Sequence, residues 1–127
     1  MKNLLIAILS LSLISCTRSE NVNCSKFKTG EFTFSEKSKV RILRSDSIQK
    51  EYSQKSGEDF IDEYAINWID SCTYSAKLIK TNHPEGTSMN VGDSMVVTIM
   101  RSKDNKYEWQ GMVNGEMKKG IMIKLNE

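Results

Sequence analysis

The three cysteines are the residues of this chain best suited to covalent chemistry, and their positions suggest different roles. Cys16 directly follows an apolar run, whereas Cys24 and Cys72 lie in polar surroundings further along. In an exported chain such a pair favours a disulfide, which here would close a loop of about 49 residues and stabilise the fold by roughly 3–4 kcal/mol. The alternative is two small, buried, unbridged side chains. Neither cysteine belongs to a C-x-x-C pair, which disfavours thioredoxin-like redox chemistry and a zinc knuckle.

Residues for acid–base or metal chemistry are sparse. His83 is the only histidine, and its polar surroundings predict a solvated loop position. Asp59, Asp62, Glu63 and Asp70 are close in sequence and could in principle form an acid–base pair, but solvent-facing strand positions explain them more simply. Dinucleotide, phosphate-loop, H-E-x-x-H and EF-hand motifs are all absent. We therefore predict a protein that is not an enzyme and holds no cofactor or metal.

The length and the charge of the chain narrow the class of protein further. The chain has 127 residues, with 18 Lys and Arg against 16 Asp and Glu scattered along it. That length suits one domain with one hydrophobic core. A nearly balanced surface provides no strong field for nucleic acid or an acidic substrate. We expect a monomer that does not bind nucleic acid.

The first residues predict an export signal. Lys2 provides one positive charge, and residues 4–14 (LLIAILSLSLI) form an apolar run. This run is shorter than the roughly 20 residues that a membrane-spanning helix needs. Residues 1–15 are therefore expected to be a signal peptide.

The sequence Leu13-Ile14-Ser15-Cys16 resembles the lipobox of bacterial lipoproteins. This resemblance implies cleavage behind Ser15 and lipidation of Cys16 with fatty acyl chains such as palmitate, and two or three chains hold a protein durably on a bilayer. A plain secretion signal with a coincidental cysteine is the alternative. Residues 16–23 would be the lipidated cysteine and a flexible polar tether, followed by a domain over residues 24–127. Because no acidic run follows Cys16, we expect an outer-membrane lipoprotein that faces the periplasm, with the cell surface as the alternative.

The domain shows the two-residue period of β-strands. Expected strands cover residues 31–34, 40–43, 48–52, 59–69, 72–78, 94–100, 107–113 and 116–125. Residues 59–69 also fit an apolar helix face, but the next alternating run starts too soon to leave room for a helix C-cap. Asn114-Gly115 strongly predicts a type I′ hairpin. About eight short strands joined by tight turns predict an all-β antiparallel meander, closed as a small lipocalin-like barrel or folded as a half-open sandwich.

The hairpin fixes a register for the last two strands. With a two-residue turn, Trp109 falls opposite Gly120, where an aromatic ring can cover bare backbone. The same register sets Glu108 opposite Ile121, which fits poorly, so we expect a bulge near residues 118–120.

Aromatic side chains on the predicted strands are the candidate ligand-binding residues. They are Tyr64, Trp68, Tyr74, Tyr107 and Trp109. Filling the core is the simpler explanation for these side chains, and also for the many methionines, whose thioethers pack adaptably.

Two stretches, from Cys24 through Phe27 to Phe32 and from Asn67 to Tyr74, look like a group of short Bacteroidota-type lipoproteins of unknown function. The resemblance covers most of residues 24–125, but its motifs are structural and transfer no functional residue. Some members carry the label DNA topoisomerase IV, an activity that a small exported chain without a nucleotide site or basic groove does not support.

We therefore expect a membrane-anchored, non-catalytic module that binds a small apolar ligand or lipid. The alternative is a protein-interaction or inhibitor module of the cell envelope, similar in architecture to small lysozyme-inhibitor lipoproteins. Such a module would use a loop around residues 82–92.

Overall fold

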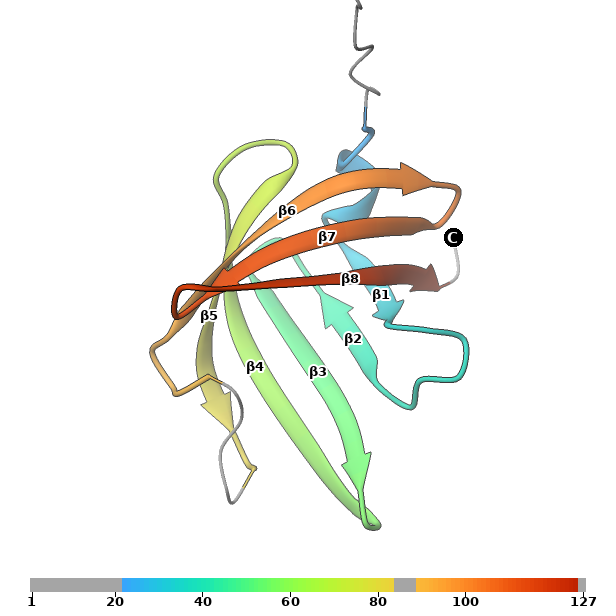
Figure 1. Cartoon of the computed structure of the whole chain (residues 1–127). Coiled ribbons are helices and arrows are strands. Elements are labelled where there is room, and N and C mark those ends of the chain that lie inside the picture. Colours follow the sequence, from blue (N-terminus) through green and yellow to red (C-terminus); the bar gives the residue numbers. More distant parts are fainter. Residues whose placement is uncertain (1–21, 84–88, 126–127) are drawn as a thin grey trace, which may run out of the picture.

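A computed structural model describes residues 22–83 and 89–125 of the chain, which form a closed antiparallel β-barrel (Figure 1). Consecutive strands pair with each other, and β1 closes the barrel against β8. The strands are β1 (Gly30–Thr33), β2 (Arg41–Arg44), β3 (Ile48–Lys55), β4 (Glu58–Trp68), β5 (Thr73–Thr81), β6 (Ser94–Lys103), β7 (Lys106–Val113) and β8 (Glu116–Leu125). The prediction of an all-β up-and-down barrel is confirmed, and closure decides against the half-open sandwich. No helix in the described ranges is long and apolar enough to span a bilayer.

Strand β4 covers the segment for which the sequence allowed either a strand or a helix. Phe60, Tyr64 and Ile66 are buried at even-numbered positions, while Ile61 and Asn67 at odd-numbered positions are exposed. This is the period of a strand, and β4 pairs with β3 on one side and with β5 on the other. A helix would have satisfied its hydrogen bonds internally and left both neighbours with open edges.

The β7–β8 hairpin follows the predicted turn and register. Asn114 and Gly115 have φ values of 49° and 79°, as a type I′ turn requires. Trp109 pairs with Gly120, and a Cβ built on Gly120 would lie 2.9 Å from the indole ring. Any larger residue at position 120 would therefore collide with this ring.

The expected bulge near residues 118–120 is wrong, because the β7–β8 pairing runs without interruption. Glu108 and Ile121 face each other on the outer surface, where Arg101 Nε donates to Glu108 Oε2 at 2.8 Å. The irregularity lies one strand away, between Ile99 and Arg101 in the β6–β7 pairing. This bulge shifts β6 against β7 and brings Arg101 opposite Glu108.

One end of the barrel is plugged by the segment that precedes β1 (Figure 1). A 3₁₀ turn, η1 (Ser25–Phe27), places the fully buried ring of Phe27 in the core. The predicted disulfide is confirmed: Cys24 in the plug is bonded to Cys72 in the β4–β5 connection, with Cα atoms 5.3 Å apart. Val22 also packs against this core, so the last residues of the expected tether already belong to the folded domain.

The core consists of two clusters along the barrel. The plugged half contains Cys24, Phe27, Phe32, Ile42, Ile99, Tyr107 and Met122. The other half contains Tyr64, Ile66, Tyr74, Ala76, Leu78, Met89, Val97 and Val113. Trp68 and Trp109 pack against both clusters and so connect the two halves.

Candidate ligand-binding site

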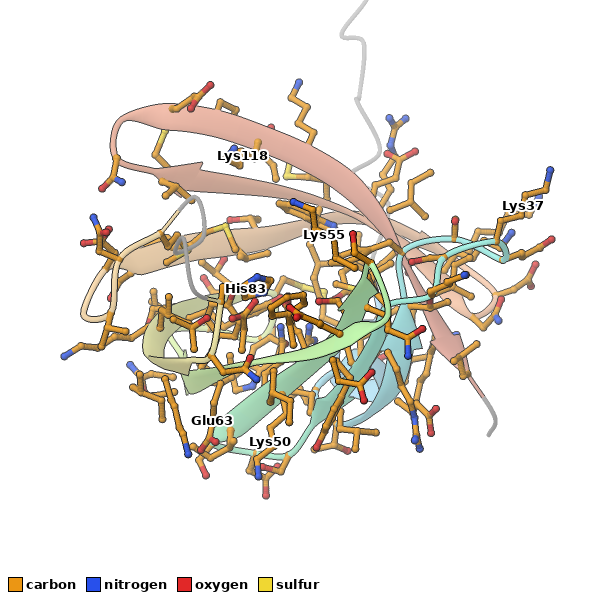
Figure 2. The ribbon with its side chains drawn as sticks, turned by 90° about the horizontal axis from the view of Figure 1, so that it is seen from below. Lys37, Lys50, Lys55, Glu63, His83 and Lys118 are labelled. Atoms are coloured by element: carbon orange, nitrogen blue, oxygen red, sulfur yellow. A yellow bond between two sulfur atoms is a disulfide. The ribbon has the colours of Figure 1, made fainter. Side chains whose placement is uncertain are left out.

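The half of the barrel away from the plug contains a cavity of about 130 Å³. Its walls are mostly apolar and come from six of the eight strands together with two loop residues. The lining residues are Phe34, Gln49, Glu51, Tyr64, Tyr74, Ala76, Met89, Met95, Val97, Trp109, Val113, Lys118 and Met122. Phe34 was expected on a strand, but β1 ends at Thr33 and the Phe34 ring lies in the following loop, 36% exposed. Lys118 comes from β8, on the opposite side of the barrel from Lys50 and Glu63, which lie on its outer surface (Figure 2).

A buried arginine lies between this cavity and the plug. Arg44, at the end of β2, is only 4% exposed. Its Nε donates to Gln49 Oε1 at 2.6 Å, and Nη1 donates to the Phe27 carbonyl at 3.0 Å. Its Nη2 donates to the hydroxyls of Tyr74 and Tyr107, both at 3.1 Å. These bonds use four of the five N–H donors of a guanidinium, so Arg44 has little capacity left to bind a ligand.

Aromatic rings complete the surroundings of Arg44. Its Cζ lies 4.7 Å from the ring centroid of Phe32 and 4.8 Å from that of Tyr74. Both rings provide cation–π contacts, which are strongest for desolvated cations. Burial also raises the pKa of the Tyr74 hydroxyl, which keeps it neutral as an acceptor for the arginine.

Gln49 connects this arginine to an acid in the cavity wall. While its Oε1 accepts from Arg44, its Nε2 donates to Glu51 Oε1 at 2.8 Å. Burial raises the pKa of the Glu51 carboxyl to about 7, and the hydrogen bond from Gln49 only partly offsets this. Asp62, the cross-strand partner of Glu51 on β4, raises the same pKa further by like-charge repulsion. Glu51 is thus a cavity acid that gains or loses its proton near neutral pH.

Asp62 and His83 lie deeper in the fold than their sequence surroundings suggested. Asp62 was expected to face solvent, yet it is 8% exposed, and its Oδ1 accepts from Thr81 Oγ1 at 2.5 Å. His83 was expected to be solvated, but its ring stacks on Phe60 with centroids 4.3 Å apart, and its Nε2 lies 3.3 Å from Asp62 Oδ2. Figure 2 shows His83 at the end of the barrel. The other three acids of that sequence cluster, Asp59, Glu63 and Asp70, lie outside the core.

The two tryptophans both have unsatisfied hydrogen-bond donors. The Nε1 atoms of Trp68 and Trp109 are buried, and neither has an acceptor among the described residues. Burying a donor without a partner costs about 1–3 kcal/mol. Trp109 lines the cavity, whereas Trp68 packs against Tyr74 with ring centroids 4.7 Å apart.

The five aromatic residues proposed from the sequence divide into two groups. Tyr64, Tyr74 and Trp109 line the cavity together. Trp68 and Tyr107 do not: Trp68 fills the space between the two clusters, and the Tyr107 ring lies 4.8 Å from Phe27 in the plugged half. Sequence reasoning missed Arg44, Gln49, Glu51 and Lys118. A polar residue at an inward position of an alternating strand is the signal for Gln49 and Glu51, but it can be recognised only once the inward face is known.

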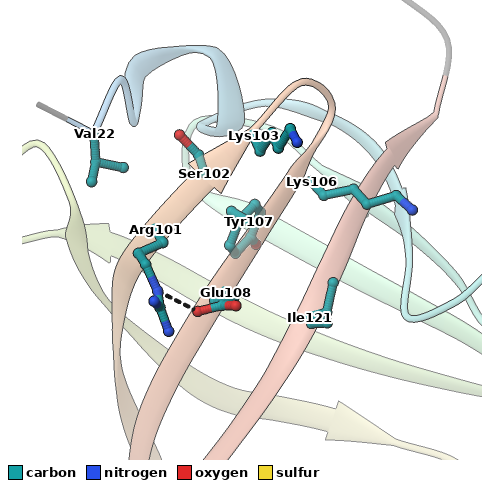
Figure 3. A pocket seen from close by; sticks show the side chains of 8 residues that line it. All are labelled: Val22, Arg101, Ser102, Lys103, Lys106, Tyr107, Glu108 and Ile121. Carbon is teal, nitrogen blue, oxygen red and sulfur yellow. Dashed lines mark hydrogen bonds and ion pairs between the residues drawn. The ribbon is translucent and has the colours of Figure 1, made fainter. Parts of the chain in front are cut away.

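A second hollow lies on the outer surface near the plug (Figure 3). It has a volume of about 520 Å³, and Val22, Tyr107 and Ile121 contribute its apolar part. Its charged side chains are exposed, and the ion pair between Arg101 and Glu108 spans its floor. The internal cavity is lined mostly by buried apolar side chains, so it is the stronger candidate site.

Metal binding has no support in the described ranges, where no three His, Cys, Asp or Glu side chains are grouped to hold an ion.

No family model, curated protein or solved structure matches this chain. The case for function therefore depends on the geometry of the cavity.

Replacing Arg44 tests whether its network holds the barrel together. We expect Arg44→Met to lower the free energy of unfolding by about 3 kcal/mol or more, because it leaves several buried groups without their donor. The measurement is urea unfolding followed by tryptophan fluorescence. Arg41→Met is the matched control on the same strand. Arg41 is exposed and paired with Glu31, and exposed ion pairs contribute little, so stability should hardly change. Similar losses for both variants would contradict the central role of Arg44.

The raised pKa of Glu51 predicts a specific pH dependence of stability. From its ordinary value of 4.5 up to about 7, the folded chain keeps a proton on Glu51 that the unfolded chain releases. The free energy of unfolding should therefore fall as the pH rises through this range, by on the order of 3 kcal/mol from this group. Urea titrations at about pH 5 and about pH 8 measure the change, and Glu51→Gln should remove this share of it. The prediction fails if both proteins show the same pH dependence.

Proposed function

We propose that this chain is a non-catalytic binding module that holds a small, largely apolar ligand inside its barrel. The observation that supports this most strongly is the cavity itself: the half of the barrel that the plug does not reach leaves about 130 Å³ unfilled between mostly apolar walls. Protein cores are normally packed as densely as organic crystals, so side chains that border unfilled space make fewer contacts than they could. A bound ligand would recover the lost contacts.

The size and the walls of the cavity indicate the kind of ligand. An engineered protein cavity of about 150 Å³ holds benzene, so a molecule of up to roughly six non-hydrogen atoms fits here. Met89, Met95, Val97, Val113 and Met122 provide apolar walls. Thioether side chains adapt their shape to a guest, which suits a small aliphatic or aromatic body.

We also propose that the barrel is held on a membrane by lipid at Cys16, facing the periplasm at the outer membrane. The plug places Val22 at the end of the barrel away from most of the cavity walls. A tether that leaves the fold there would let the lipid reach a bilayer without covering the cavity. This position supports a ligand module that stays accessible while it is anchored.

A second candidate function, a protein-interaction or inhibitor module of the cell envelope, is favoured by one observation on the outer surface. Val96, Met112 and Met117 are paired in register across β6, β7 and β8, and each is more than two-fifths exposed. Contiguous exposed apolar side chains are typical of contact surfaces. The loop first considered for such contacts lies partly outside the described residues.

Native mass spectrometry tests the binding proposal directly. Residues 17–127, which contain all eight strands and both bridged cysteines, would be produced in an oxidising bacterial periplasm. We expect an adduct of small-molecule mass that Val97→Trp abolishes, because the larger ring fills the cavity. Val96→Trp on the outward face is the matched control and should keep the adduct. A clean protein mass, together with no binding of added aliphatic compounds, would contradict the proposal and favour the interaction module.

Fractionation of cells that express the full chain tests the anchor. The chain should sediment with outer membranes, whereas Cys16→Ser should lose the acyl mass and leave the membrane fraction, because the acyl chains provide the affinity for the bilayer. Equal membrane association of both proteins would contradict lipid anchoring at Cys16.

A further inference from the structure

One carboxylate oxygen of Glu51 is an acceptor that the protein leaves unused. Glu51 lines the cavity, and its Oε1 accepts from Gln49 Nε2 at 2.8 Å. Within residues 22–83 and 89–125, Oε2 accepts no hydrogen bond. It is not fully buried either, in contrast to the indole nitrogens of Trp68 and Trp109. A molecule in the cavity therefore has access to a carboxylate oxygen that has no donor of its own.

The hydroxyl of Tyr64 is a second unused group in the same wall. Tyr64 is the cross-strand partner of Gln49 and also lines the cavity. Its hydroxyl makes no hydrogen bond to another described residue, and it too keeps some accessible surface. Burial raises the pKa of this hydroxyl, and the negative charges of Glu51 and Asp62 raise it further, so the three groups are neighbours. A neutral tyrosine hydroxyl accepts hydrogen bonds as well as donating them.

The charges around Glu51 favour a cationic ligand group over an anionic one. Burial is the largest cause that raises the pKa of Glu51, and the negative charge of Asp62, its cross-strand partner, raises it further. Arg44 lies beyond the amide of Gln49 and offsets this least. Lys118, which lines the cavity from β8, has no part in the shift. A positive charge beside Glu51 would therefore supply an attraction that the described residues hardly provide.

We propose that the cavity binds a small primary aliphatic amine in its ammonium form, which donates to Glu51 Oε2 and to the Tyr64 hydroxyl while its alkyl chain lies among the methionine and valine walls. This inference rests on the proposed binding function and specifies the class of ligand. An ammonium has three N–H donors, enough for both acceptors. At about 130 Å³, the cavity suits a chain of roughly three to five carbons, by comparison with the benzene-sized cavity.

Binding of the ammonium should be coupled to ionisation of Glu51. Burial raises the pKa of Glu51 to about 7, so most of the free protein carries a neutral acid there one pH unit below this value. A primary amine, like the lysine side chain, stays charged well above neutral pH. Because the ion pair needs the carboxylate, affinity should rise about tenfold from about pH 6 to about pH 8. His83, which contacts Asp62 with Nε2 and Oδ2 3.3 Å apart, is the other titratable group nearby.

Isothermal titration calorimetry with three matched four-carbon probes tests the head group. Butan-1-amine, butan-1-ol and butanoate, all within the limit of roughly six non-hydrogen atoms, would be titrated into residues 17–127 at about pH 8. We expect the amine to bind at least tenfold more tightly than the other two, because charge-assisted hydrogen bonds are roughly twice as strong as neutral ones. Butanoate binding most tightly would overturn the proposal and assign the head group to Lys118. Equal binding of the amine and the alcohol would overturn it as well.

Replacing the acid tests its role directly. Glu51→Gln keeps the size of the side chain and an oxygen for Gln49, but it removes the charge. It should weaken the amine at least tenfold, leave butanol unchanged and abolish the rise in affinity between about pH 6 and about pH 8. Glu63→Gln is the matched control, because Glu63 pairs with Lys50 on the outer surface (Figure 2). His83→Gln should keep the pH dependence, since His83 contacts Asp62.

Replacing the tyrosine tests the second acceptor. Tyr64→Phe keeps the ring and removes the hydroxyl, so it should weaken the amine about tenfold, the loss of one hydrogen bond to a charged group. Tyr52→Phe is the matched control at an outward position of β3, opposite the exposed Ile61, and should bind the amine like the original chain. Circular dichroism would confirm that every variant is folded.

The outcomes separate this inference from the proposed function. If butanol or butanoate binds at least as tightly as the amine and Val97→Trp abolishes that binding, the cavity is a ligand site and only the amine assignment is wrong. If none of the three probes binds and the native mass is clean, both proposals are wrong. Amine affinity that is the same in Glu51→Gln and Glu63→Gln, or that does not change with pH, would also overturn the amine assignment.

Discussion

The guanidinium of Arg44 is the interaction on which the rest of the barrel depends. It connects the carbonyl of Phe27 in the plug, the hydroxyls of Tyr74 on β5 and Tyr107 on β7, and Gln49 on β3. A buried cation is tolerated only when its donors are satisfied, and here four of the five are. Because each acceptor lies on a different element, the arginine fixes the plug relative to the strands in a way that apolar contacts alone would not.

The hydrogen bonds of Arg44 also lead, through Gln49, to the acid Glu51 in the cavity wall. The amide of Gln49 lies between Arg44 and Glu51 and hydrogen-bonds to both, so the acid makes no direct hydrogen bond to the cation and feels its charge only as a minor influence. Burial and the nearby Asp62 then raise the pKa of Glu51 into the neutral range. The result is a cavity wall whose charge is sensitive to protons, next to walls of methionine and valine.

The two ends of the barrel are built differently, which explains why the internal cavity of about 130 Å³ lies in the half away from the plug. In the plugged half, Phe27 and the Cys24–Cys72 disulfide fill the interior with side chains from outside the sheet. The other half receives no such segment among the described residues, and its walls include the small side chains of Ala76, Val97 and Val113. Trp109 on β7 covers Gly120 on the neighbouring strand β8, and its buried N–H has no acceptor among the described residues. The unfilled space therefore lies in the half that the plug does not reach.

The sequence alone determined the class of fold, because strand periodicity and turn chemistry are local properties. The alternation along residues 94–100 and the Asn114-Gly115 turn were enough to predict the strands, the hairpin and the Trp109–Gly120 pairing. The pair of bridged cysteines also followed from their number and the expected export. Three of the five proposed ligand residues, Tyr64, Tyr74 and Trp109, do line the cavity.

Tertiary structure alone decided which polar residues face inward and meet. In the sequence, Arg44, Gln49, Glu51 and Lys118 look like ordinary surface residues of a charged protein, and Asp62 and His83 were expected to be solvated. Their roles depend on barrel closure and on register, since a shift of one residue would turn each side chain to the other face. Closure brings β3 opposite β7 and so places Glu51 across the interior from Trp109, a relation between residues far apart in sequence that no local pattern encodes.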